Sequence, residues 1–79
     1  MRARLKNLLA KHVGHYVRLS FTVASSDTTE TAEGFLEEVN DEYLILTHPD
    51  GSVVVLSNIT VYAAEILPSK QHATLGGYE

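Results

Sequence analysis

The fold is decided by the segment GFLEEVNDEYLIL, residues 34–46. Its composition predicts two short strands, 32–39 and 42–47, joined by a tight turn at Asn40-Asp41. A glycine inside a strand weakens it and commonly marks a sharp bend in a small barrel. Gly34 therefore predicts a strongly curved β-sheet.

A helix and a further strand are predicted before this segment. Residues 2–13 place Leu5, Leu8, Leu9 and His12 on one stripe of a 3.6-residue period, and Gly14 is positioned to end the helix. Apolar and polar residues then alternate, which predicts a half-buried strand over 16–23. The polar segment 24–31, ASSDTTET, is expected to be a loop.

The segments after residue 46 predict a turn at Pro49-Asp50-Gly51 and two further strands, 52–57 and 59–66. The run Val53 to Leu56 is apolar at every position, which is typical of a strand covered on both faces. A chain this short has too few residues to cover both faces of the strand. We therefore expect a second copy of the chain to cover one of them. The candidate subunit-interface residues are Val53, Val54, Val55, Leu56, Ile59, Val61 and Ala63. Residues 68–79 are expected to form a flexible tail.

Length and cysteine content also favour self-association. A chain of 79 residues forms one small domain with a thin stability margin, which small folds usually supplement with disulfides, metals or oligomerisation. The sequence has no cysteine, so oligomerisation is the expected support. The fold class is mainly β: a short N-terminal α-helix followed by a strongly bent five-stranded antiparallel SH3-like or Sm-like barrel over residues 1–67.

The order of elements and the segment Gly34 to Asn40 resemble the Sm-like (LSm/Hfq-type) family. This segment is similar to the family signature of glycine, two spaced apolar residues and Asp or Asn. Residues 54–59 are similar to the second signature in their outer apolar positions and in Asn58. The resemblance spans residues 5 to about 67. Other small SH3-like barrels share the same pattern.

The resemblance implies a closed homo-oligomeric ring in which the fourth strand of one subunit pairs with the fifth strand of the next. It also implies binding of single-stranded, often uridine-rich RNA in an RNA-chaperone-like role. This chain departs from the family at the usual pore-side RNA site. Val55-Leu56 stands where many Sm proteins have Arg-Gly, and Val55-Leu56-Ser57 stands near the Hfq-type Tyr-Lys-His.

Charge is strongly segregated along the chain, although the net charge is only −4. Five of the six Lys and Arg residues lie in residues 1–18, which contain no acid, whereas residues 19–69 contain nine acids and no Lys or Arg. A basic face next to an aromatic side chain is typical of single-strand binding. The candidate RNA-binding residues are Arg2, Arg4, Lys6, Lys11, Tyr16 and Arg18. The alternative is a structural or adaptor ring whose basic helical face binds an acidic protein.

Catalytic and metal chemistry find little support in the sequence. The four histidines, His12, His15, His48 and His72, show no ligand spacing with cysteines or converging carboxylates. No nucleophilic triad, paired-carboxylate or phosphate-loop pattern is present. We therefore expect a protein that is not an enzyme and has no cofactor or metal. No apolar run reaches the roughly 18 residues of a membrane span, and a cytoplasmic location is expected.

Overall fold

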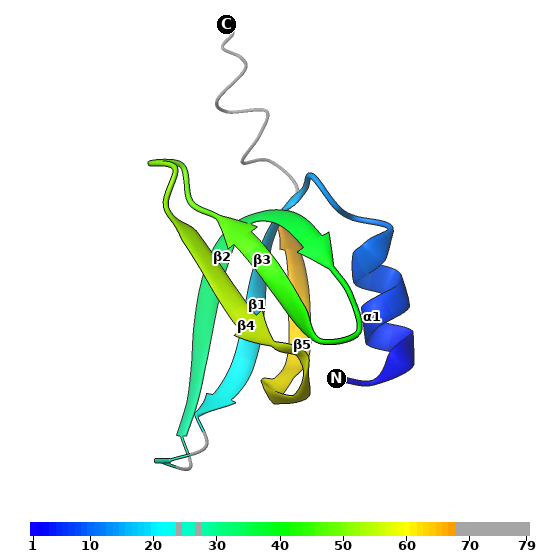
Figure 1. Cartoon of the computed structure of the whole chain (residues 1–79), viewed down its shortest axis with the longest axis vertical. Coiled ribbons are helices and arrows are strands. Elements are labelled where there is room, and N and C mark those ends of the chain that lie inside the picture. The colour runs from blue at the N-terminus through cyan, green and yellow to red at the C-terminus, as the bar shows by residue number, and fades with distance from the viewer. Residues whose placement is uncertain (24, 27, 68–79) are drawn as a thin grey trace, which may run out of the picture.

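The computed structural model describes residues 1–23, 25–26 and 28–67 (Figure 1). The predicted flexible tail, 68–79, lies outside these residues. One short helix precedes five strands, which confirms the predicted fold class. The elements are α1 (Ala3–Ala10), β1 (Tyr16–Val23), β2 (Thr28–Val39), β3 (Tyr43–Thr47), β4 (Val53–Ser57), the 3-10 turn η1 (Asn58–Thr60) and β5 (Val61–Leu67).

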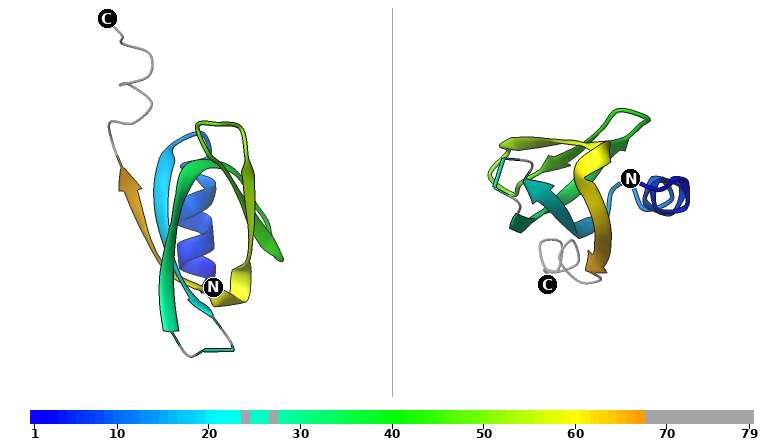
Figure 2. Two further views of the ribbon diagram at one scale, coloured as in Figure 1. Left: turned by 90° about the vertical axis from the view of Figure 1, so that its left-hand side faces the viewer. Right: turned by 90° about the horizontal axis from the view of Figure 1, so that it is seen from below.

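The five strands form one antiparallel sheet in the order β4-β3-β2-β1-β5. The sheet curls into a small barrel-like form, with α1 beside it (Figure 2). β4 and β5 are the outermost strands, and within the described chain each is paired on one side only. An unpaired strand edge presents backbone donors and acceptors to any chain that approaches.

The sheet curves along β2, because this strand pairs first with β1 and then with β3. Its residues Thr28–Phe35 pair with β1, and Phe35–Val39 pair with β3, with a register shift between Leu36 and Glu38. Gly34 lies where β2 passes from one neighbour to the other. A Cβ atom there would be 3.0 Å from the Thr47 carbonyl oxygen and 3.1 Å from Leu46 Cβ. The absence of a side chain therefore permits the close approach of β3.

Alternate residues of the strands face a core that α1 closes at one end. Leucine and valine side chains dominate this core, and most of them are completely buried. They are Leu9, Val17, Leu19, Leu36, Leu44, Leu46, Leu56 and Val61. Each fully buried side chain of this size contributes about 1.5–3 kcal/mol relative to exposure.

The helix is shorter than predicted, and its apolar stripe is only partly buried. It ends at Ala10 rather than at 13, because residues 11–14 form the turn that leads into β1. Gly14 adopts a φ of 95° and donates its N–H to the Leu36 carbonyl oxygen at 2.7 Å, so it leaves the helical path to join β2. Leu9 is buried, but Leu8 of the same stripe is 50% exposed.

The predicted loop 24–31 is wrong in its second half. Thr28 to Thr31 belong to β2 and pair with β1 in the register Val23↔Thr28 to Ser20↔Thr31. The segment looks like a loop because its side chains are polar on both faces. This end of the hairpin extends beyond the core, where β-branched threonine still favours extended backbone.

The fifth strand begins at Val61 rather than at 59, because Asn58–Thr60 form the turn η1. Asn58 is 6% exposed and connects η1 to the turn between β2 and β3 through hydrogen bonds. Its backbone N–H donates to the Glu42 carbonyl oxygen at 3.0 Å, and its side-chain amide donates to the Asn40 carbonyl oxygen. Three further strand boundaries differ from the predicted ones by one residue, since β3 begins at 43, β4 begins at 53 and β5 ends at 67. Both ends of β1 and the last residues of β2, β3 and β4 are as predicted.

The close approach at Gly34 gives a direct test of the fold. Gly34→Ala is expected to lower the free energy of unfolding by about 1–3 kcal/mol, because the new methyl group crowds the β3 backbone. Urea denaturation at matched protein concentration measures this change. Thr29→Ala, at an exposed position in the same strand, is the control and should change little. Equal stabilities of the two variants would contradict the packing described.

Candidate functional site

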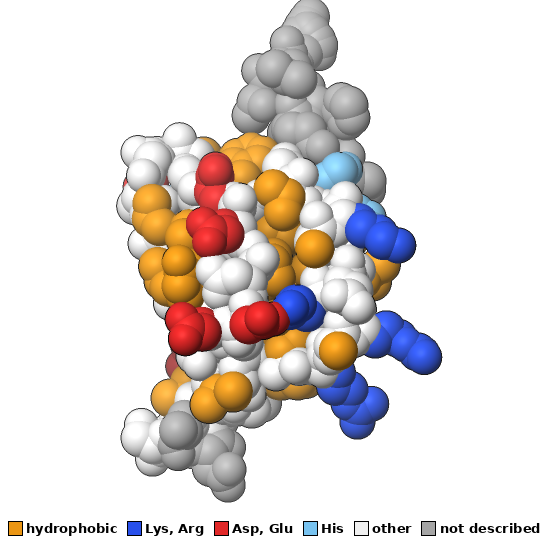
Figure 3. Space-filling model, turned by 45° about the vertical axis from the view of Figure 1, so that its right-hand side comes forward, with side chains coloured by type: hydrophobic (Ala, Val, Ile, Leu, Met, Phe, Trp, Pro, Cys, Tyr) orange, Lys and Arg blue, Asp and Glu red, His pale blue; other side chains and the backbone are white. Residues whose placement is uncertain are grey.

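The basic face of the helix consists of Arg2, Arg4 and Lys11 in the structure. All three side chains reach solvent, and none forms an ion pair with any residue in the described ranges. Figure 3 shows Lys and Arg side chains gathered on one side of the molecule, with most of the visible acidic groups on the opposite side. Arg2, Arg4 and Lys11 thus lie apart from the acids, whereas Lys6 and Arg18 contact them.

Lys6 differs from these three residues because it reaches an acid. Its Nζ donates to Asp41 Oδ1, in the turn between β2 and β3. This hydrogen bond, and then the lysine charge, hold the pKa of the Asp41 carboxyl below its usual range. Of the helical cations predicted to bind RNA, Lys6 therefore already has an anionic partner.

Arg18 also contacts acids, on the strand β1, which lies between β2 and β5. Its Nε donates to Glu33 Oε2 and its Nη1 donates to Glu65 Oε1, each at 2.8 Å. These acids are its register partners on β2 and β5. The two carboxylates raise the pKa of the guanidinium and surround it with negative charge. A phosphate that approached this guanidinium would be repelled by both carboxylates.

Tyr16 is not placed as a stacking platform. Its side chain is 7% exposed and packs edge-to-face against Phe35, with ring centroids 5.0 Å apart. Burial, followed by the charge of Glu33, raises the pKa of its hydroxyl. A nucleotide base has no access to either face of the ring in this conformation. The sequence pattern placed Tyr16 next to basic residues but did not reveal which way the strand faces.

The candidate interface residues divide between the core and the surface. Leu56 and Val61 are core residues, Val54 packs against the core, and Ala63 is half-buried. Val53 and Val55 are 57% and 60% exposed on β4. Ile59, in η1, is 85% exposed. The apolar run therefore reaches solvent at alternate residues, on a strand whose outer edge lacks a partner among the described residues.

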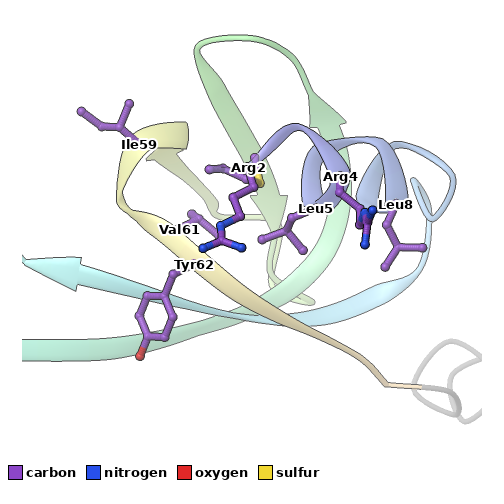
Figure 4. A pocket seen from close by; sticks show the side chains of 8 residues that line it. Arg2, Arg4, Leu5, Leu8, Ile59, Val61 and Tyr62 are labelled. Atoms are coloured by element: carbon purple, nitrogen blue, oxygen red, sulfur yellow. The ribbon is translucent and has the colours of Figure 1, made fainter.

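A groove that the sequence analysis did not identify lies between α1 and β5. It has a volume of about 650 Å³, and most of its wall is apolar. The apolar residues that line it are Met1, Leu5, Leu8, Ile59, Val61 and Tyr62. Arg2 and Arg4 also line it, and Figure 4 shows Arg2 extending from the start of the helix across Val61 toward Tyr62. The groove could not be recognised from the sequence, because Leu8 and Ile59 occur in apolar patterns like those of core residues.

Other chemistry has no assembled site in the described part of the chain. No group of three or more His, Asp or Glu side chains there is arranged to hold a metal ion. His12 and His15 lie edge-to-face, with ring centroids 5.2 Å apart, next to the end of the helix. Within the same ranges no helix is long and apolar enough to cross a membrane.

Comparison with protein-family models and with curated proteins finds no match for this sequence. Membership of the Sm-like family therefore stays a prediction, carried by the residues quoted above and by the order of the elements.

The contact between Lys6 and Asp41 predicts a measurable change in pKa. In Lys6→Gln the pKa of Asp41 should return toward its ordinary range, because both causes of its depression are removed. The depressed pKa stabilises the fold above the pKa of the unfolded carboxyl. This contribution disappears as the pH falls through the folded pKa. Carboxyl NMR titration measures the shift, and Lys11→Gln is the control. An unchanged Asp41 pKa in Lys6→Gln would contradict the contact.

Proposed function

We propose that this protein is a homo-oligomeric ring that binds single-stranded RNA. The observation that supports assembly is the pair of strands at the ends of the sheet. Among the described residues β4 and β5 each have one unpaired backbone edge, and β4 also exposes Val53 and Val55. Joining β4 of one copy to β5 of the next satisfies both edges at once. A head-to-tail contact of this kind closes into a ring if the rotation per subunit divides a full turn.

The support for RNA as the ligand is the row of cations on the helix. Arg2, Arg4 and Lys11 have no acidic partner in the described ranges, whereas acids hold Lys6 and Arg18 in the isolated chain. One chain offers few contacts to a phosphate backbone, but a ring repeats them on one face. Such repetition supplies the multiple phosphate contacts that single-strand binding requires. The RNA-binding residues in this proposal are therefore Arg2, Arg4 and Lys11, without Tyr16 and Arg18.

The second candidate is an adaptor ring whose helical face binds an acidic protein. One observation favours it: Arg2 and Arg4 line a groove whose other walls are mostly aliphatic, with Tyr62 as its one aromatic side chain. Phosphate backbones need charge, whereas protein segments also need apolar contact. Neither candidate uses a catalytic group.

The assembly is tested by placing a charge on β4. The wild-type chain should elute at several times 8.7 kDa in size exclusion with light scattering. Val55→Asp should reduce this mass while the fold is retained, because Val55 is 60% exposed in the single chain. Val61→Asp should instead unfold the chain, because burying an unpaired charge costs several kcal/mol. Val13→Asp is the control at an exposed position outside β4. A wild-type monomer, or an undiminished mass in Val55→Asp, would contradict the ring.

RNA binding is tested by neutralising the helix. Replacing Arg4 and Lys11 with Gln should weaken binding of short oligouridine and flatten its salt dependence. The log–log slope should fall by about 0.7 for each phosphate that the variant no longer neutralises. Tyr16→Ala should change the affinity for RNA only as far as it destabilises the fold, since the tyrosine side chain is buried. Filter binding at low salt measures both effects. No binding at about 50 mM salt, with the assembly verified in the same sample, would exclude RNA and leave the adaptor function.

A further inference from the structure

The groove between α1 and β5 gathers half of the exposed large apolar side chains among the described residues. Of six such residues, Leu8, Ile59 and Tyr62 line it, with exposures of 50%, 85% and 55%. Contiguous exposed apolar surface on a small domain commonly marks an interaction site. The volume of about 650 Å³ falls in the range of ligand and peptide pockets. The groove is thus large enough to take two or three apolar side chains.

The charge at the groove restricts the ligand. Arg2 and Arg4 line it, and neither has an acidic partner among the described residues. A second shallow hollow, lined by Arg4, Asn7, Leu8 and Lys11, continues along the helix. Positive charge therefore flanks the apolar surface for two turns of the helix. A complementary ligand presents apolar groups followed or flanked by negative charge.

The chemistry of the walls favours a protein segment over RNA. The lining is aliphatic except for Tyr62, and apart from the two arginines only the tyrosine hydroxyl offers a polar side-chain group. Bases are held by stacking between rings and by hydrogen bonds to their edges. Aliphatic side chains pack instead against aliphatic walls. RNA bound through its phosphates can contact the helix without entering the groove.

The strand β4 of a second copy is a poor match for the positive charge of the groove. The strand proposed to meet β5 in the ring is β4, Val53–Ser57, which contains no acidic residue. It would satisfy the edge of β5 and supply no acid to either arginine. We propose that the groove binds a short segment of a partner protein that presents apolar side chains next to Asp or Glu. This proposal rests on the adaptor function above and names its site and ligand chemistry.

The experiment is selection from a random peptide display library, with the oligomeric protein as target. Enriched peptides should combine bulky apolar residues with Asp or Glu. Their affinity, measured by fluorescence polarisation on synthetic copies, should fall about tenfold or more in Ile59→Asp and in Leu8→Gln. Val13→Asp, which changes an exposed valine outside the groove, should leave it unchanged. Circular dichroism and thermal unfolding verify that each variant is folded.

Charge is tested by a second matched pair. Arg2→Gln should weaken peptide binding several-fold, whereas Lys11→Gln should weaken it less, because Lys11 lines only the second, shallower hollow. Failure to enrich any apolar-acidic peptide would overturn both the groove proposal and the adaptor function.

If the peptides bind Ile59→Asp and Leu8→Gln as tightly as wild type, the groove is not their binding site. The adaptor function would then remain supported, with the peptide bound at another surface. A fall in oligomer mass caused by Ile59→Asp would assign the groove to another copy of the chain and would also overturn the proposal. Retained RNA binding by the same variant would show that RNA contacts the helix without entering the apolar groove.

Discussion

The close approach of β3 to β2 at Gly34 is the constraint on which the rest of the structure depends. With a Cβ atom 3.0 Å from the Thr47 carbonyl oxygen, the two strands could not meet at this point without a shift. The approach lets one long strand pair with β1 along its first part and with β3 along its second. The sheet is thereby bent around a core of leucines and valines. Within the described residues the bent sheet ends in β4 on one side and β5 on the other, each with one unpaired edge.

The distribution of ion pairs determines which cations remain available. Along the sequence the basic residues look alike, but Arg18 lies in a strand flanked by strands that carry Glu33 and Glu65 at the same register. Lys6 lies within reach of the turn that carries Asp41. Exposed pairs of this kind add little stability, about 0–1 kcal/mol each. Their larger effect is on recognition, because a phosphate must compete with carboxylates already in place. Only cations directed away from the sheet avoid this competition.

The sequence predicted the fold closely and the site only in part. Period-two alternation and the glycine signals located every strand, because each signal reflects local backbone geometry. The helix end and the threonine end of β2 were misjudged, since both depend on pairing with another element. Gly14 donates a hydrogen bond to Leu36 in β2, and residues 28–31 pair with β1 across the hairpin. Tyr16 was misjudged as a platform because exposure of a strand residue depends on its neighbours, here Phe35. The groove was missed because its two walls, α1 and β5, are far apart in the chain.

The positions of β4 and of the groove are compatible with both of the proposed contacts in one small domain. Pairing of strand edges is made through backbone hydrogen bonds and depends little on side-chain identity. The sequence VVVLS of β4, which has no charged residue, is therefore compatible with it. Recognition in the groove depends on side chains, namely aliphatic walls and two guanidinium groups that have no acidic partner in the described chain. A charge on Val55 therefore acts on the first contact and a charge on Ile59 on the second. Because these residues belong to different elements and both are exposed in the single chain, each contact can be removed while the core stays intact.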